Sequence, residues 1–200
     1  MPSLPARISA EIGDAGRGVL RLLRFDPLWA EQLDLSADGF LRSFWAPLLA
    51  LPLNLLVIDA WARAQGSAVQ HPSLFGAAVS HLFDAFAFPL VLAVLARPTG
   101  ITTGYGALVI LANWAGLFLN VALAVAALPL LLLGGGSAAA FSFVALLLSG
   151  GYIFALWRAG RETVGRPPAG GVGAVGPVLM VVVLAVGVGS VADRVGAWLS

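Results

Sequence analysis

An ionisable pair interrupts an apolar run near the middle of the chain. Asp84 and His81 lie within the stretch SHLFDAFAFP, and their spacing of three residues places both on one face of a helix. A charged carboxylate at the centre of a bilayer costs about 2.5–3.5 kcal/mol, so we expect Asp84 to face other helices, either protonated or paired. His81 is its nearest partner in sequence. The pair therefore predicts a proton-linked or substrate-binding site inside a helical bundle.

Three asparagines lie in similarly apolar surroundings. At 1.5 Å per residue, Asn54 and Asp84 each lie about 16 Å from the start of their apolar runs. Asn113 falls in the middle third of its run, whereas His81 and Asn120 lie nearer the outer side. These five residues define a polar layer that extends from the midplane to the outer leaflet.

The polar layer has a second interpretation, in which its members only fasten helices to one another. Interhelical hydrogen bonds in membranes average about 0.6 kcal/mol and recur in bundles without any catalytic role. We favour this interpretation for the asparagines, whose amide groups can donate across helices. For Asp84 both interpretations stay open, because intramembrane carboxylates commonly mark proton or substrate pathways.

The sequence lacks the motifs of most membrane enzymes. It contains no HExxH, no GxSxG and no Walker-type phosphate loop, and no second intramembrane aspartate completes a proteolytic dyad. Cysteine is absent, and one of the two histidines, His71, falls in a loop, so we expect no transition-metal site. A net charge of +1 argues against a nucleic-acid partner. We therefore predict no catalytic residue, no metal and no cofactor.

The elements that would position these residues are membrane-spanning helices. Of the 200 residues, 60% are hydrophobic and 10% are charged, whereas soluble domains carry about 25% charged residues. A spanning helix needs about 20 mostly apolar residues, and five segments qualify. We predict an all-α, polytopic five-helix transmembrane bundle over residues 43–200, with the third span open to extension through Leu133. The predicted spans are residues 43–62, 73–96, 105–128, 138–157 and 174–195.

The arginines predict the orientation of this bundle. If the N-terminus lies in the cytoplasm, nine of the eleven arginines fall inside, and only Arg63 and Arg194 fall outside. The N-terminus is then cytoplasmic and the C-terminus external. The aromatic residues expected at the two interfaces are Trp45, Tyr105 and Trp157 on the inside and Trp61 and Trp198 on the outside. Trp114 breaks this pattern, because it falls in the middle of a span.

Residues 1–42 form a polar arm that precedes the first span. Its first forty residues lack a secretory signal, and we expect the arm to be retained. Residues 8–24 have the periodicity of an amphipathic helix, with arginines on one face and apolar residues on the other. Asp26-Pro27 is expected to end this helix, and Ser36 to cap the run into the first span. The helix either lies in the cytoplasmic membrane interface with its arginines toward headgroups, or packs on the end of the bundle.

Two stretches resemble the Ypt-interacting-protein (Yip) family of five-span membrane proteins and its bacterial relatives. They are YIFALWRAGRETVGRPPAG at residues 152–170 and FPLVLAVLARPTGITTGYGALVILANW at residues 88–114. The resemblance implies a five-span fold after a polar arm and a membrane location. The DLYGP signature of the eukaryotic members is absent, and no functional residue carries over from the family.

These observations lead to an expected role. All eleven basic residues are arginine, which is typical of GC-rich bacterial genes, so we expect a multi-pass protein of a bacterial cytoplasmic (inner) membrane. We predict a non-enzymatic protein that organises the membrane or assists a partner as a scaffold. The alternative is a small-solute or proton-linked transporter or channel component that uses Asp84, and a membrane-embedded enzyme is the third. Besides the lipid bilayer, we expect a membrane-protein partner or a homo-oligomer, since Gly150-Gly151 and the Ala185/Gly189 pair allow close helix approach.

Overall fold

A computed structural model describes residues 4–65, 73–99, 104–133 and 138–163. This part of the chain is helical and contains no strand, which confirms the all-α prediction. The elements in chain order are α1 (Leu4–Leu23), the 3-10 helix η1 (Pro27–Gln32), α2 (Ala37–Ser43), α3 (Trp45–Gln65), α4 (Leu74–Thr99), α5 (Tyr105–Leu133) and α6 (Ala138–Thr163).

Four helical stretches are long and apolar enough to cross a membrane, and each overlaps one of the first four predicted spans. They are Ala37–Ala64, Leu74–Val94, Tyr105–Leu132 and Ala138–Glu162. The first begins early because α2 runs almost directly into α3, with Phe44 between them in helical conformation (φ −71°, ψ −8°). Helix α5, which contains the third stretch, continues to Leu133 with Pro129 inside it, so the longer of the two predicted ends is the observed one. The fifth predicted span, residues 174–195, lies outside the described residues.

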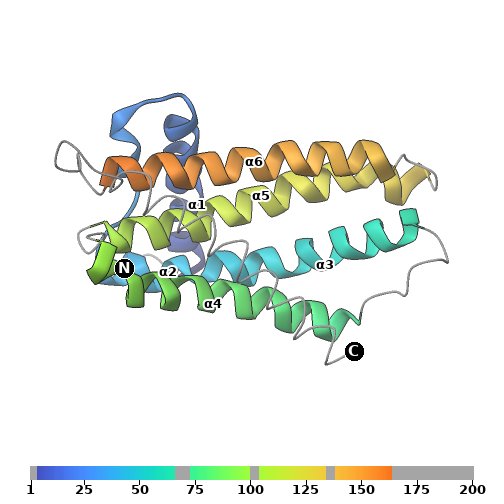
Figure 1. The fold of residues 1–200 in the computed structure, drawn as a ribbon, viewed down its shortest axis with the longest axis horizontal. Helices are drawn as coiled ribbons and strands as arrows, with labels where there is room; N and C mark the ends of the chain where they lie inside the picture. The colour runs from blue at the N-terminus through green and yellow to red at the C-terminus, as the bar shows by residue number, and fades with distance from the viewer. Residues whose placement is uncertain (1–3, 66–72, 100–103, 134–137, 164–200) are drawn as a thin grey trace.

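The bundle is organised around α5. Helices α3 and α6 pack along it, and α4 packs mainly against α3 (Figure 1). Every residue from Leu108 to Ala115 on α5 is buried. Away from this core the helices expose large apolar side chains, for example Leu90, Val94 and Leu132. Hydrocarbon would solvate such surfaces at no cost, whereas water would not, so the exposed sides are suited to lipid.

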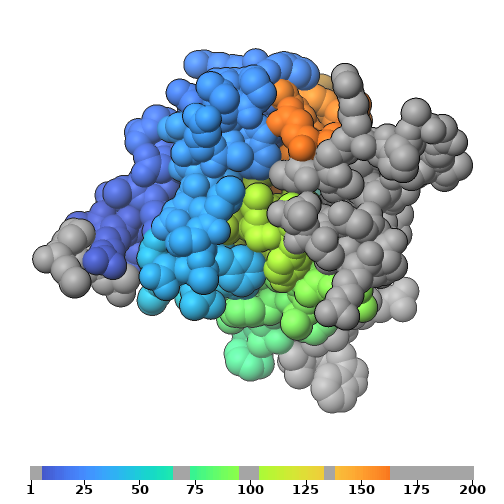
Figure 2. All heavy atoms as spheres, turned by 90° about the vertical axis from the view of Figure 1, so that its left-hand side faces the viewer, coloured from blue at the N-terminus to red at the C-terminus, as the bar shows by residue number. Residues whose placement is uncertain are grey.

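Helix α1 runs across the bundle instead of along it (Figure 1). It packs on α5 and α6 through one stripe, in which Ala15 and Leu22 are buried and Ile12 and Val19 are partly buried. The other side of the helix, which carries Arg17, is exposed. Viewed from the end of the bundle, the arm covers one side of that end (Figure 2).

Short polar contacts set the path of the chain between α1 and α3. The Ser36 side chain accepts a hydrogen bond of 3.0 Å from the Gly39 backbone N–H, which confirms Ser36 as the cap of the following helix. Helix α1 ends before Asp26 and Pro27, as predicted. A Cβ atom at Gly39 would lie 2.1 Å from the carbonyl oxygen of Asp34, so only glycine fits at this close approach.

Candidate intramembrane polar cavity

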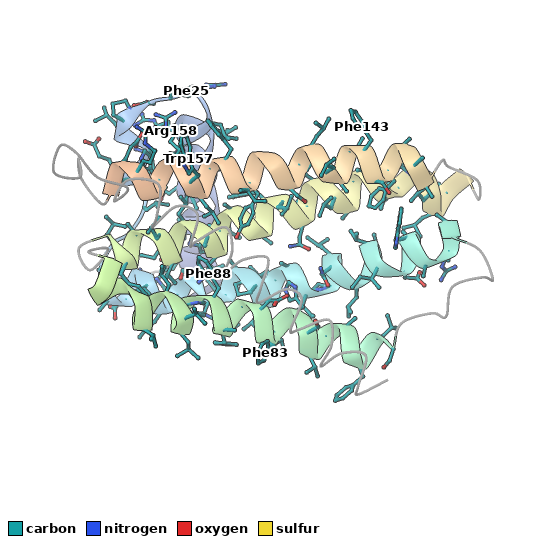
Figure 3. All side chains as sticks on the ribbon, in the orientation of Figure 1. Phe25, Phe83, Phe88, Phe143, Trp157 and Arg158 are labelled. Atoms are coloured by element: carbon teal, nitrogen blue, oxygen red, sulfur yellow. The ribbon has the colours of Figure 1, made fainter. Side chains whose placement is uncertain are left out.

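A cavity of about 150 Å³ lies between α3, α4, α5 and α6. Since one water molecule takes up about 30 Å³ of liquid, the space has room for about five waters or one small solute. Its walls contain both polar and apolar side chains, the latter including Phe88. Phe88 points toward α5, whereas Phe83 points away from the bundle (Figure 3). The polar side chains that line the cavity are His81, Asp84, Asn113, Asn120 and Tyr152.

Helix α4 contributes the ionisable pair of the sequence prediction. Asp84 and His81 both line the cavity, as their shared helix face predicts, and Oδ1 of Asp84 is buried. Nε2 of His81 lies 2.9 Å from the carbonyl oxygen of Pro47 on α3. A carbonyl oxygen can only accept a hydrogen bond, so Nε2 carries the hydrogen and is the donor. This bond orients the imidazole ring at the cavity wall.

The asparagines join α5 to α3 and its N-terminal extension. Asn54 donates from Nδ2 to Oδ1 of Asn120 at 3.4 Å, and Asn120 donates to the carbonyl oxygen of Gly116 at 2.9 Å. Asn113 donates to Oγ of Ser43 at 2.9 Å. The predicted donation of both amides across helices is therefore present.

The two interhelical bonds lie at different depths. Ser43, the partner of Asn113, precedes Asn54 by about 16 Å of helix. Ser43 is fully buried at the α2 end of the bundle, where its hydroxyl also donates to the carbonyl oxygen of Phe40 at 2.7 Å. The polar residues thus lie at different levels along the bundle, and Asn54, unlike Asn113 and Asn120, does not line the cavity.

Tyr152 is a cavity residue that sequence reasoning missed. It belongs to α6, and its hydroxyl lies 3.5 Å from the carbonyl oxygen of Ala112 on α5. A tyrosine within an apolar helix usually directs its hydroxyl to a buried partner. That tendency could have indicated Tyr152 as a buried polar residue. The sequence alone could not show which face of α6 meets α5.

A second polar cluster fastens the arm to the end of α6. Arg158 is only 8% exposed, and its guanidinium donates to Oε1 of Glu162 at 2.8 Å and to the carbonyl oxygen of Leu22 at 2.7 Å. The indole N–H of Trp29 donates to Oε2 of Glu162 at 2.5 Å. The Leu22 carbonyl belongs to the last turn of α1, which lacks intrahelical donors. The i,i+4 spacing of arginine and glutamate was the sequence signal for this cluster.

A third cluster holds the other side of the arm. Arg42 donates to both Glu11 on α1 and Asp34, the latter at 2.5 Å. Hydrogen bonds from the Ser36 side chain and backbone, together with the Arg42 guanidinium, hold the pKa of Asp34 below its usual value. Hydrogen bonds at Arg158 and Glu162 therefore hold the arm to α6, and the charge pairs of Arg42 join α1 and Asp34 to α2.

The described ranges contain no group of three or more histidine, aspartate or glutamate side chains placed to hold a metal ion. No family model, curated protein or solved structure matches the chain. The fold and the cavity are therefore interpreted from their own geometry, and the resemblance to the Yip family stays a prediction.

Proposed function

We propose that this protein binds a small polar solute or a proton in the cavity between α3, α4, α5 and α6, as a transporter or channel component. One observation carries the proposal: five polar side chains border an open space instead of filling it. Helix contacts that only fasten a bundle pack to the density of an organic crystal. A polar-walled space inside a membrane protein provides a solute with hydrogen-bonding partners that the surrounding lipid lacks.

In this proposal Asp84 carries the exchangeable proton, because among the described residues it is the only one with a carboxyl group that lines the cavity. Loss of its proton places a negative charge in the cavity, which favours a cation or a hydrogen-bond donor there. The bond from Nε2 to Pro47 holds His81 in place beside it. Asn120 and Tyr152 supply neutral groups along the wall. The expected ligand is therefore small, polar, and cationic or rich in donors.

The proposed orientation places the arm in the cytoplasm of a bacterial cell and the C-terminus outside, with residues 174–195 as the fifth span. The distribution of arginines supports it, since Arg158 and Arg161 lie at the end of α6 beside the arm. Reporter fusions at Gly134 and Ser200 test this topology. Both positions are expected outside, and a cytoplasmic signal at Ser200 would overturn the five-span count.

The experiment on function is proton flux in proteoliposomes, measured with an internal pH-sensitive dye under a potassium diffusion potential. Wild-type protein is expected to conduct protons above protein-free vesicles, and Asp84→Asn to lose this flux with a thermal midpoint within about 3 °C of wild type. Asp59→Asn is the matched control, because it removes the carboxylate of an exposed pair with Arg63 outside the cavity. Equal flux in wild type and Asp84→Asn contradicts the proposal.

The scaffold role is the second candidate, and the fastening of the arm favours it. Hydrogen bonds from the arm to the Arg158–Glu162 pair, and the charge pairs of Arg42 within the arm, hold the arm in one place, so its exposed side forms a constant surface for a partner. Crosslinking in native membranes is expected to recover a stoichiometric partner if this role is correct. Repeated recovery of the chain alone, with proton flux intact in vesicles, would instead favour the transport role.

A further inference from the structure

An aromatic and arginine surface lies where the arm meets α6. The rings of Phe25 and Phe154 are 6.0 Å apart, and those of Phe154 and Trp157 are 5.6 Å apart. The guanidinium of Arg158 lies 4.4 Å from the centre of the Phe25 ring, and that of Arg161 lies 5.0 Å from the Trp157 ring. These five residues contact one another in a continuous series, which we call the aromatic–arginine patch. Figure 3 labels three of them, Phe25, Trp157 and Arg158.

Phe25 has an unusual backbone conformation within this patch. Its φ is 66°, the left-handed region that favours glycine. Two hydrogen bonds, from the Phe25 N–H to the Leu22 carbonyl and from the Asp26 N–H to the Arg21 carbonyl, complete the helix-ending motif in which glycine is usual. Phenylalanine is strained there, and residues in such conformations cluster at functional sites.

The Phe25 side chain is apolar, yet most of it is exposed. The residue is 67% exposed, and its neighbours Leu23 and Leu28 are exposed as well. In water this residue would be unfavourable for two reasons, the backbone strain and the exposure of an apolar ring. The arrangement becomes favourable if the ring enters the boundary between lipid headgroups and acyl chains, where aromatic side chains prefer to lie. The exposed face of the arm's end thus has the chemistry of a membrane-facing surface.

The arginines near the patch differ in whether they form an ion pair with a carboxylate. Arg17 and Arg21 are paired with Asp14 and Asp26. Among the described residues, neither Arg24 nor Arg161 makes an ion pair with a carboxylate. Arg24 directly precedes Phe25, and Arg161 lies over Trp157. Arg161 thus places an uncommitted guanidinium beside the aromatic surface, and Arg24 carries a second one on the residue before Phe25.

We propose that the aromatic–arginine patch, together with Arg24, binds the phosphate group of an anionic phospholipid in the leaflet on the arm side of the membrane. Arg24 and Arg161 contact the phosphate, which guanidinium groups recognise with paired hydrogen bonds. Phe25 and Leu23 enter the adjacent apolar region. The inference does not depend on the cavity or its ligand, and it uses the membrane orientation only to name the leaflet as cytoplasmic.

Electron paramagnetic resonance of spin-labelled lipids tests this site on the full chain in vesicles. Spin-labelled phosphatidylglycerol is expected to associate with the wild-type protein about fivefold more strongly than spin-labelled phosphatidylcholine. The double variant Arg24→Gln/Arg161→Gln is expected to bring this ratio close to one. Arg17→Gln is the matched control, because it removes an exposed arginine of α1 that is already paired, and it should keep the wild-type ratio.

Phe25→Gly gives an independent readout. Glycine relieves the strained φ and removes the ring, so the variant should be at least as stable as wild type in detergent while its association with phosphatidylglycerol falls. If the double variant fails to fold, the two single variants replace it, each with an intermediate ratio. Equal association of both lipids with wild type, or a loss in Arg17→Gln as large as in the double variant, overturns the proposal.

Discussion

The arm and the cavity use polar side chains in opposite ways. Where the arm meets α6, a charged group is buried against its partners, since Arg158 donates to Glu162 and to a helix-end carbonyl of α1. Around the cavity, neutral amides bond to carbonyls or to each other, and Asp84 borders open space. A buried cluster leaves little space for a further ligand, whereas the cavity has room for one. In the proposed function the cavity therefore binds the ligand, while the buried contacts of Arg158 hold the arm in place.

The largest expected effect is on the fastening side, at Gly39. Replacing Gly39 with alanine should destabilise the protein by on the order of 3 kcal/mol, because the new Cβ would meet the Asp34 carbonyl oxygen at 2.1 Å and the backbone must move. Unfolding in mixed micelles measures this loss. Gly106→Ala is the control, since nothing lies within 4 Å of a Cβ there and alanine favours a helix. Equal stability of the two variants would contradict the close approach.

Arg158→Met should give the next largest effect, a loss of about 2–3 kcal/mol, since it removes two hydrogen bonds from a charged group and leaves Glu162 without this partner. Faster tryptic cleavage of the arm measures its release from α6. Arg63→Met is the matched control, because Arg63 forms an exposed i,i+4 pair with Asp59, which is worth less than about 1 kcal/mol. Similar losses in both would show that burial of the Arg158 pair does not matter.

On the cavity side, Asn54→Leu should cost only about 0.6 kcal/mol, the usual value of an interhelical hydrogen bond in a membrane. The bond to Asn120 is long, at 3.4 Å, and Asn120 keeps its bond to the Gly116 carbonyl. Proton flux in proteoliposomes should be retained in this variant and lost in Asp84→Asn. Loss of proton flux in both variants would mean that Asn54 belongs to the ligand site and does not only join α3 to α5.

The smallest expected effect is a dependence of arm stability on acid. The pKa of Asp34 lies below its ordinary value of 3.8 because the folded arm stabilises the charged form, chiefly through Ser36. Its contribution is therefore present above about pH 4 and is lost as the pH falls through the lowered value. Thermal midpoints of wild type between pH 3 and pH 6 should show this loss. Asp34→Asn should flatten that part of the profile, while Asp14→Asn, on the exposed side of α1, should leave it in place.

Part of the cavity was predictable because its residues share one helix. Asp84 and His81 lie three residues apart on α4, so helical geometry alone places them on one face. Tyr152 and Pro47 come from α6 and α3, and their approach depends on how those helices are rotated about their axes. These helices carry apolar residues on all sides, so the sequence does not indicate which face of each helix points into the bundle. The cavity itself was therefore not predictable.

In the arm too, local features were predictable from the sequence and long-range pairs were not. Periodicity predicted the α1 helix, Asp26-Pro27 its end and Ser36 the next cap, since each depends on neighbours along the chain. The pairing of Arg42 with Glu11, and of Arg158 with the Leu22 carbonyl, joins residues far apart in sequence. Any of several arginines could have served in these pairs. Only the crossing of α1 over α5 and α6 selects the ones that do.

The sequence by itself determined that the chain is helical and apolar enough to cross a membrane, and it located the four described spans, with ends that differ from the observed ones by up to about six residues. These properties follow from local composition, because a backbone in lipid must satisfy its own hydrogen bonds within each helix. The tertiary structure decided which polar groups meet. Hydrogen bonds and charge pairs act over about 3 Å, so their partners are set by helix rotation and packing.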